Sequence, residues 1–432
     1  MQFGSTSRLA LVAATALTLG TAISTPSFAD KVTLTYYVDD NSTTVATAEG
    51  LKAAFEAENP DITIDIETHP AGGEGDNLVK TKLATGDMAD VFRYNAGSLF
   101  HALNPTQNLL DLTSEPFEAN VIDSFKPVVT EDGKVFGVPE EAAMGGGILY
   151  NRKIYADLGL SVPKTWAEFI ANSEKIKAAG KTAVIQTFGD TWTSQLFVLG
   201  DFYNVQAAVP TFAADYTANK AHYADTPAAQ KGFEHGEEVF KAGYLNADFA
   251  SAKFDDGLRQ LATGEGAHYP MLTFAIGAIA TNFPDTVNDV GFFAIPGDDA
   301  AKNGLTVWEP AAVYISKATK HPDEAKKFVA FIASTKGCDI RSAAKGDTGP
   351  YLIKGCTLPA DVPQAVKDLL PYFQDGGNSS PALEYLSPVK GPSLEQITVE
   401  VGSGIREAKD AASLYDEDVK KQALQLGLLG WN

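Results

Sequence analysis

The sequence contains few of the residues on which metal sites, redox sites and disulfide-rich scaffolds depend. Only two cysteines and six histidines occur among its 432 residues. Two cysteines are too few for a disulfide-rich scaffold, and they do not stand at the C-x-x-C spacing of a redox motif. No histidine pair has the H-E-x-x-H spacing of a zinc site. We therefore expect no metal and no cofactor.

The sequence also lacks local signatures of a nucleophile or a phosphate-binding loop. The G-x-S-x-G elbow of serine hydrolases does not occur. The glycine-rich segments 72–75 and 145–147 lack the Lys-Ser/Thr pair of a phosphate loop, and we interpret both as turns or hinge-adjacent backbone. These absences favour a protein that holds a molecule over an enzyme that converts one.

Positive charge is scarce relative to negative charge. The chain has 34 Lys and Arg against 55 Asp and Glu, a formal net charge of −21. Such an excess argues against nucleic-acid partners and anionic membrane surfaces, whereas it is compatible with a neutral ligand. Beyond the N-terminus no apolar run approaches the length of a membrane span, since 271–280 is too short. We expect no membrane insertion.

The N-terminal residues have the pattern of a removable export signal. Arg8 precedes the apolar stretch 9–23, and Ser27-Phe28-Ala29 places small residues at −3 and −1 of a cleavage site. We expect a signal peptide at 1–29, with cleavage after Ala29 and secretion into a periplasm. The alternative, a membrane anchor, would need a longer apolar stretch and a basic flank.

Cys338 and Cys356 are the two cysteines. In an oxidising compartment one disulfide between them is the default expectation, and it would stabilise the fold by about 3 kcal/mol. Two buried free thiols are the alternative.

The first part of the mature chain alternates between strand and helix patterns. Residues 31–38, 62–66 and 90–92 are expected strands, separated by helices around 45–55 and 78–84. This alternation is typical of a mostly parallel sheet covered by helices.

The alternation continues in the rest of the chain. Thr165 and Glu168 have the spacing of a capping box at a helix start. The remaining expected elements are strands at 148–150, 183–187, 290–295 and 312–315, a strand or turn around 268–274, and helices within 226–262 and at 323–334.

Five segments of the mature chain have a recognisable pattern and order. They are LATGDMADV at 83–91, DGKVFGVP at 132–139 followed by LYNR at 149–152, PKTWAEF at 163–169, LATGEGA at 261–267 and GFFAIPG at 291–297. Together they resemble the extracellular solute-binding proteins of ABC importers, in particular the carbohydrate-binding group that includes maltose-binding protein. Ala89 stands where that family usually has Pro, and His268 where it usually has Met.

The resemblance implies an α/β fold of two lobes joined by hinge crossings, with ligand bound between the lobes. Each lobe would then be discontinuous in sequence. We expect the N-terminal lobe at 30–139 and 291–345, and the C-terminal lobe at 140–290 and 346–432. The resemblance also implies a sugar ligand, a monomer, and the transmembrane subunits of an ABC permease as partners.

Four aromatic residues stand where the resemblance places side chains that stack on sugars: Tyr94, Trp192, Phe274 and Trp308. Each follows or precedes an expected strand or helix end. The alternative for any of them is ordinary core packing.

Polar candidates stand at the ends of the same expected strands. Asp39, Asp40 and Asn41 end the first strand, and capping or turn formation is their alternative role. Glu140 and Glu141 follow a hinge-like Val-Pro pair, with solvated charge as the alternative.

Further candidates adjoin the ones above. Asn95 and Glu309 neighbour the aromatic candidates. We expect Arg93 to pair with Asp39 or Asp40, and recognition of an acidic group of the ligand is its alternative role. Less specific contributors are Arg341, Asp347 and Tyr351.

We therefore predict the periplasmic substrate-binding component of an ABC importer that captures a mono- or small oligosaccharide. One alternative is a secreted glycosidase-like enzyme, which needs two carboxyl groups about 5–9 Å apart across the scissile bond. Neighbouring pairs such as Asp39-Asp40 are poorly placed for that geometry. The other alternative is a binding protein for a polyol or a glycerol phosphate compound.

Overall fold

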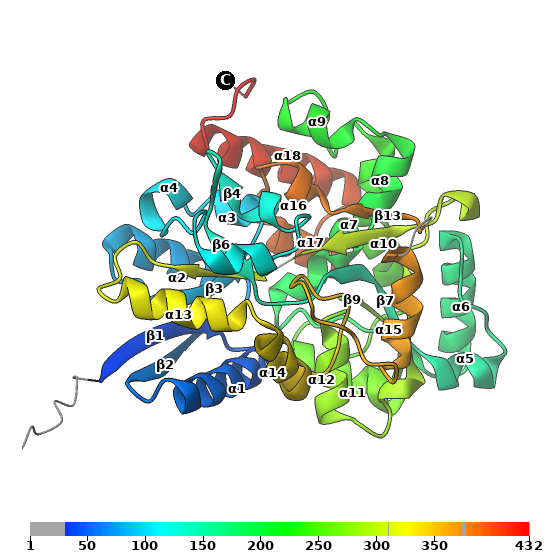
Figure 1. Ribbon diagram of the computed structural model, residues 1–432. Helices are drawn as coiled ribbons and strands as arrows, with labels where there is room; N and C mark the ends of the chain where they lie inside the picture. The colour runs from blue at the N-terminus through cyan, green and yellow to red at the C-terminus, as the bar shows by residue number, and fades with distance from the viewer. Residues whose placement is uncertain (1–30, 310, 374–376, 432) are drawn as a thin grey trace, which may run out of the picture.

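The chain builds two separate mixed β-sheets with helices packed around each of them (Figure 1). We call the elements around the first sheet the first lobe and those around the second sheet the second lobe. The structure is a computed structural model and describes residues 31–309, 311–373 and 377–431. The expected signal peptide and its cleavage site after Ala29 lie outside the described residues.

The first sheet has the order β2-β1-β3-β12-β6. Leu34, Tyr36 and Val38 of the inner strand β1 are buried, as the apolar pattern predicts. Strands β2 and β3 pair with β1 in parallel, and β12 runs antiparallel to β3. The strands are β1 (Val32–Asp39), β2 (Ile62–His69), β3 (Val91–Asn95), β6 (Gly137–Pro139) and β12 (Ala311–Ile315), with a separate hairpin of β4 (Thr130–Glu131) and β5 (Lys134–Val135).

Aromatic packing joins this sheet to its helices. The Phe328 ring lies 5.3 Å from Tyr36 of β1 and 5.0 Å from Phe55 of α1, centroid to centroid. All three side chains are buried, so they form one apolar layer. The helices of the first lobe are α1 (Ser42–Glu58), α2 (Gly73–Thr85), α3 (Ser98–His101), α4 (Pro105–Asn108), α13 (Pro322–Ile332) and α14 (Thr335–Lys345).

The second sheet is organised around β7, all eight residues of which are buried. Strands β9, β10 and β11 all pair with β7 in antiparallel fashion. The strands are β7 (Met144–Asn151), β8 (Thr182–Val184), β9 (Gly266–Leu272), β10 (Val290–Ala294), β11 (Leu305–Trp308) and β13 (Ser379–Pro381).

The interpretation of 145–147 as a turn is wrong, because these glycines lie inside β7. A Cβ on Gly146 would stand 2.2 Å from the Trp308 ring. The missing side chain lets the indole pack directly on the strand. Glycine at this position therefore allows Trp308 to pack closely against β7.

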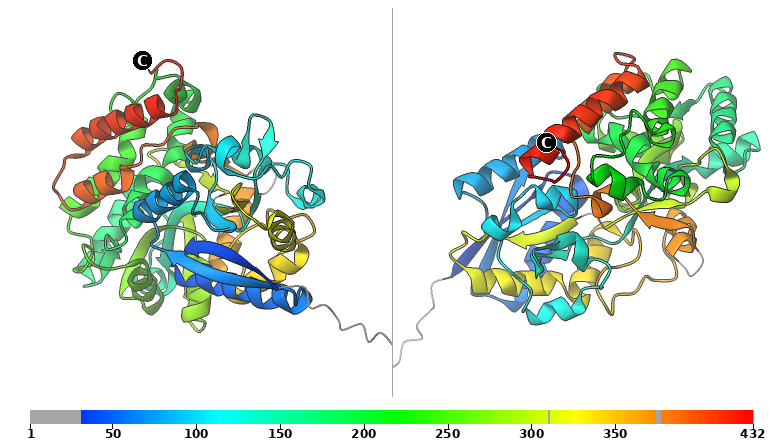
Figure 2. Two further views of the ribbon diagram at one scale, coloured as in Figure 1. Left: turned by 90° about the vertical axis from the view of Figure 1, so that its left-hand side faces the viewer. Right: turned by 90° about the horizontal axis from the view of Figure 1, so that it is seen from above.

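Helix starts and ends follow local signals in the second lobe. The Thr165 hydroxyl accepts a hydrogen bond from the Glu168 backbone N–H, as predicted, but the Glu168 carboxylate accepts from Lys164 N–H and not from Thr165. Figure 2 shows α17 and α18 next to each other, and α10 packs against both. The helices are α5 (Arg152–Leu158), α6 (Trp166–Ala178), α7 (Leu196–Gly200), α8 (Phe202–Ala208), α9 (Phe212–Thr217), α10 (Pro227–Lys241), α11 (Phe254–Thr263), α12 (Ala275–Asn282), α15 (Gln364–Leu369), α16 (Leu383–Leu386), α17 (Leu394–Gly402) and α18 (Ala408–Gln425). Among the described helices, none combines the length and apolar character needed to cross a membrane.

The chain crosses between the two sheets at places that differ from two of the expected boundaries. Strands β10 and β11 pair with β7, so residues 291–308 belong to the second sheet although we expected them in the first lobe. The chain returns to the first sheet only between β11 and β12. Leu352 and Ile353, expected in the C-terminal lobe, pack in the core of the first lobe. Short strand runs carry no information on which sheet they join, so sequence could not place these crossings.

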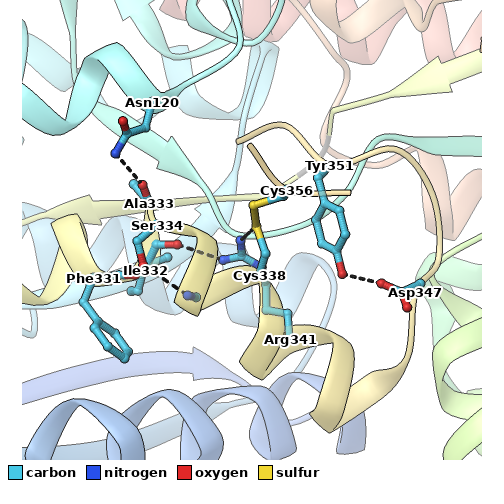
Figure 3. Close-up of a disulfide and its surroundings, with 11 residues drawn as sticks. Asn120, Phe331, Ile332, Ala333, Ser334, Cys338, Arg341, Asp347, Tyr351 and Cys356 are labelled. Carbon is cyan, nitrogen blue, oxygen red and sulfur yellow. Dashed lines mark hydrogen bonds between the residues drawn. A yellow bond between two sulfur atoms is a disulfide. The ribbon is translucent and has the colours of Figure 1, made fainter. Parts of the chain in front are cut away.

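Cys338 and Cys356 form a disulfide in the first lobe (Figure 3). It joins α14 to the segment around Cys356, after which the chain passes from the first lobe to the second for the last time. Their separation of 18 residues corresponds to a stabilisation of about 3 kcal/mol from loop closure in the unfolded chain. The disulfide thus holds the segment around Leu352 on the core of the first lobe.

Asp201 gives the fold a predictable pH dependence. Its carboxyl group is 1 % exposed, and burial raises its pKa from 3.8 to about 8. The folded chain therefore binds more protons than the unfolded chain across this window, and stability falls as the pH rises through it. We expect Asp201→Asn, which can still accept the hydrogen bond from Asn204, to gain on the order of 1–3 kcal/mol relative to wild type between pH 5 and pH 7.

Urea unfolding of both proteins at several pH values measures this difference. Asp225→Asn is the matched control, because its side chain is 83 % exposed and it is not among the groups that shift the pKa of Asp201. A constant difference between Asp201→Asn and wild type from pH 5 to pH 8 would contradict the prediction.

Candidate ligand-binding cleft

A cleft of about 710 Å³ opens between the two lobes. The first lobe contributes the ends of β1 and β3 and the first turns of α2. The second lobe contributes the 3₁₀ turn Thr191–Gln195, the end of β9 and the start of α17. Strand ends, helix starts and a short turn therefore supply the lining, in front of the two sheets.

An aromatic platform forms one wall of the cleft. The ring centroids of Trp192 and Phe274 lie 6.0 Å apart, and both side chains are half-buried. Buried Phe254 lies beneath them, 5.4 Å from each ring. The platform is held from below and offers flat apolar faces to the cleft.

Trp308 and Tyr94 also line the cleft but are mostly packed in the interior. Trp308 is 2 % exposed, and its indole N–H donates a hydrogen bond to Glu384. Tyr94 is buried, and burial followed by the neighbouring Asp76 raises the pKa of its hydroxyl. Burial in turn raises the pKa of Asp76 to about 6.

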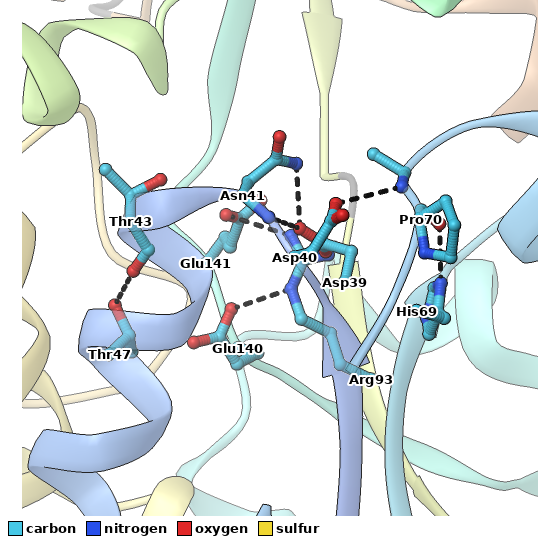
Figure 4. Close-up of polar contacts among 11 residues, drawn as sticks. Asp39, Asp40, Asn41, Thr43, Thr47, His69, Pro70, Arg93, Glu140 and Glu141 are labelled. Carbon is cyan, nitrogen blue, oxygen red and sulfur yellow. Dashed lines mark hydrogen bonds and ion pairs between the residues drawn. The ribbon is translucent and has the colours of Figure 1, made fainter. Parts of the chain in front are cut away.

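Arg93 gathers three carboxylates at the first-lobe side of the cleft (Figure 4). Its guanidinium pairs with Asp39 at the end of β1, with Glu140 at 3.3 Å and with Glu141 at 3.0 Å. Burial alone would lower the pKa of Arg93, but Asp39, Glu141 and Glu140 together raise it above its ordinary value. Glu140 and Glu141 lie between β6 and β7, where the chain first passes from the first lobe to the second. The cluster therefore links residues of the cleft to residues of the hinge. The expected pairing of Arg93 with Asp39 is present.

Asn41 and Asn95 complete the predicted residues that reach the cleft. Asp39 accepts hydrogen bonds from both the backbone and the side chain of Asn41, at 3.2 and 2.7 Å. Asn95 is exposed at the end of β3. The predicted residues in the lining are Asp39, Asn41, Tyr94, Asn95, Glu141, Trp192, Phe274 and Trp308.

Three predicted residues lie outside the lining. Asp40 accepts a hydrogen bond from Ala71 N–H in the loop after β2. The local turn bond that we weighed for this group is accepted by Asp39, from Asn41 N–H. Glu140 is covered behind Arg93. Glu309, on the crossing after β11, accepts a hydrogen bond from Ser124, and burial raises its pKa.

The more distant candidates pack around the disulfide (Figure 3). Buried Arg341 donates hydrogen bonds to Ile332 O and to Cys338 Sγ, each at 3.1 Å. The Tyr351 hydroxyl donates to Asp347. None of the three candidates lines the cleft.

Sequence reasoning missed several charged residues of the lining. Glu384, Lys390 and Glu395 come from the C-terminal part of the chain, where no local pattern points to a site. His69 ends β2 beside the predicted Asp39, and burial lowers its pKa. Its position at a strand end was a usable signal. Within the described ranges, no three His, Cys, Asp or Glu side chains are grouped so as to hold a metal ion.

Two α/β lobes, crossed by the chain at a hinge and separated by a cleft lined with aromatic and polar groups, define a two-lobed binding protein. The chain belongs to the bacterial extracellular solute-binding protein family, whose model matches residues 39–337. This is a family of binding proteins that act outside the cytoplasmic membrane.

Named relatives agree with this assignment. The chain is 28 % identical over 336 residues to a multiple sugar-binding protein of Streptococcus mutans, covering 76 % of each chain. It is 26 % identical to the melibiose/raffinose/stachyose-binding protein MelE of Bacillus subtilis, covering 66 % of each. Among solved structures, a chitin oligosaccharide binding protein superposes with a TM-score of 0.79 at 23 % identity, covering 92 % of this chain and all of that one. The two-lobed fold is thereby confirmed.

Proposed function

We propose that this chain is the periplasmic receptor of an ABC importer and that it captures a carbohydrate by closing its two lobes. The carrying observation is the platform of Trp192 and Phe274 opposite hydrogen-bonding groups of the first lobe. Sugar rings present apolar C–H faces and a rim of hydroxyls. A flat aromatic wall faced by carboxylates and amides is complementary to both.

The charges of the cleft support a neutral ligand. Arg93 is shared among three carboxylates, and Lys390 pairs with Glu384 at 3.1 Å. Arg93 and Lys390 are therefore committed within the protein. The third cation of the lining, Lys80, acts on the buried carboxyl group of Asp76, whose pKa it lowers against the effect of burial. Each cation thus has a carboxylate of the protein beside it, which disfavours a phosphorylated ligand. The cleft volume falls within the range of about 300–1,000 Å³ that is typical of small-molecule sites.

Lobe closure supplies the mechanism. A ligand held by the platform of the second lobe also reaches Asn41 and Asn95 of the first lobe, so the closed arrangement gains contacts that an open one lacks. The closed protein would then dock on the transmembrane permease, whose ATPase drives transport. The names of the relatives support a sugar oligomer as cargo.

The test is a thermal-shift and calorimetric screen of the protein from Asp30 onward. The panel holds raffinose, stachyose, melibiose, diacetylchitobiose, sorbitol and glycerol 3-phosphate. We expect a rise of several degrees with one class of sugar, and that sugar recovered intact. Cleaved sugar would support the glycosidase alternative, and binding of only sorbitol or glycerol 3-phosphate would replace the carbohydrate assignment.

The platform makes a separate prediction. Trp192→Ala should weaken binding of the sugar found in the screen by roughly 30-fold or more, and Phe274→Ala by roughly 5- to 10-fold, because the stacked faces are lost. Isothermal titration calorimetry measures both. Phe331→Ala, a half-buried aromatic outside the cleft, should leave the affinity unchanged. Equal affinities for all three variants would remove the stacking role.

A further inference from the structure

Glu395 reaches across the cleft from the second lobe to the first. It stands in the first turn of α17 and is 5 % exposed. Its Oε1 accepts a hydrogen bond from Gly73 N–H, at the start of α2, at 2.9 Å, and from the side chain of Gln396 at 3.1 Å. The positive end of the α2 dipole favours a carboxylate at this place. One oxygen of Glu395 therefore holds the two lobes together.

The other oxygen of the same carboxylate is buried in the cleft lining without a partner. Within the described ranges, no hydrogen-bond donor reaches Glu395 Oε2. Burying a carboxylate oxygen without a hydrogen-bond donor costs free energy, so a donor from outside the protein would stabilise this site.

A buried hydrogen-bond donor that also lacks a partner lies close to this oxygen. The indole Nε1 of Trp192 is buried and has no acceptor among the described residues. A Cβ on Gly72 would stand 3.1 Å from Glu395 Oε2 and 3.4 Å from Trp192 Cδ1, the ring carbon bonded to Nε1. Gly72 has a φ of +78°, which favours glycine, and a side chain at this position would press against both residues. A buried acceptor and a buried donor, both without partners among the described residues, thus lie beside the same glycine.

We propose that Glu395 Oε2 and Trp192 Nε1 form a hydroxyl-recognition pair beside Gly72, the first accepting a hydrogen bond from a ligand hydroxyl and the second donating one. A hydroxyl group both donates and accepts, so a diol or a single hydroxyl of a sugar satisfies both atoms. This inference rests on the proposed function and specifies its chemistry. Because Glu395 Oε1 also accepts a hydrogen bond from Gly73 N–H, the same carboxylate binds the ligand and links the two lobes.

Two variants separate the parts of this pair. Glu395→Gln keeps a carbonyl oxygen for Gly73 N–H but places an NH₂ donor where Oε2 accepted. Trp192→Phe keeps an aromatic ring on the platform and removes only the N–H. With raffinose, stachyose and diacetylchitobiose as probes, we expect affinity losses of about 10- to 100-fold for Glu395→Gln and about 3- to 10-fold for Trp192→Phe.

The controls make each outcome informative. Glu400→Gln removes a carboxylate of the same helix that pairs with Arg406 outside the cleft, and it should bind like wild type. The double variant should lose less than the sum of the two single losses if one hydroxyl bridges both atoms.

Two results would overturn the inference, and they are distinguishable. Wild-type affinity in both Glu395→Gln and Trp192→Phe, with wild type itself binding a probe, would remove the hydroxyl pair and leave the carbohydrate receptor standing. No binding of any probe by wild type would overturn the carbohydrate assignment and the pair together. Thermal unfolding of each variant excludes loss of folding as the cause.

Discussion

Replacing Arg93 with methionine is expected to lower the free energy of unfolding by about 3–5 kcal/mol at pH 7. The substitution removes the cation that Asp39, Glu140 and Glu141 share. All three carboxylates are at most 8 % exposed, so water cannot replace the lost charge. Arg341 still acts on Glu140 and Glu141, but it is itself fixed by hydrogen bonds to Ile332 and Cys338. Urea unfolding monitored by circular dichroism measures the loss.

The cluster has one cation and three carboxylates, so removing a carboxylate is the control for removing the cation. Asp39→Asn removes one of three negative charges and leaves Arg93 with two carboxylate partners, so no buried cation is left unpaired and the loss of stability should be smaller than in Arg93→Met. Arg93→Lys should fall between the two, because an ammonium group cannot present the fork that reaches three carboxylates. A loss in Asp39→Asn as large as that in Arg93→Met would show that the cluster does not depend on its single shared cation.

Trp308→Ala is expected to lower stability by about 3–5 kcal/mol as well, through a cavity in the interior. The indole is 2 % exposed and packs on Gly146 of β7, where no side chain can fill the space. Met144 and Ala382 complete its surroundings. The truncation also leaves Glu384 without the indole N–H donor.

Two companion variants identify the cause. Trp308→Phe keeps most of the ring and loses only the hydrogen bond to Glu384, so it should lose about half as much stability or less. Trp192→Ala, at a half-buried position, should lose less stability than Trp308→Ala and more affinity. Chemical denaturation and calorimetry on the three variants test this order. A loss of only about 1 kcal/mol in Trp308→Ala would mean that the site collapses around the smaller residue.

Much of the fold was predictable because strand and helix patterns are local. The expected first strand at 31–38 corresponds to β1 (Val32–Asp39), and the helix expected at 78–84 lies within α2 (Gly73–Thr85). The interpretation of 145–147 as a turn was wrong, because glycine in a buried strand and glycine in a turn look alike until the packing partner, Trp308, is known.

The candidate site was predictable where it follows strand ends. Asp39, Tyr94 and Trp192 each come shortly after an expected strand, and each lines the cleft. Successive side chains in an extended segment point to opposite sides, so moving by one residue decides whether a side chain points into the cleft or away from it. Asp39 lines the cleft, whereas its neighbour Asp40 lies outside the lining and accepts a hydrogen bond from Ala71 N–H in the loop after β2.

By itself the sequence determined the class of the protein and its alternating α/β organisation, since five ordered segments and local apolar periodicity need no long-range information. It also determined a strongly negative chain in which cations are scarce. Only the tertiary structure decided which carboxylates meet Arg93, which sheet receives β10 and β11, and that Glu395 bonds Gly73 across 322 residues of sequence. The physical reason is that contacts between distant segments are set by how the two lobes pack, and no local pattern records that packing.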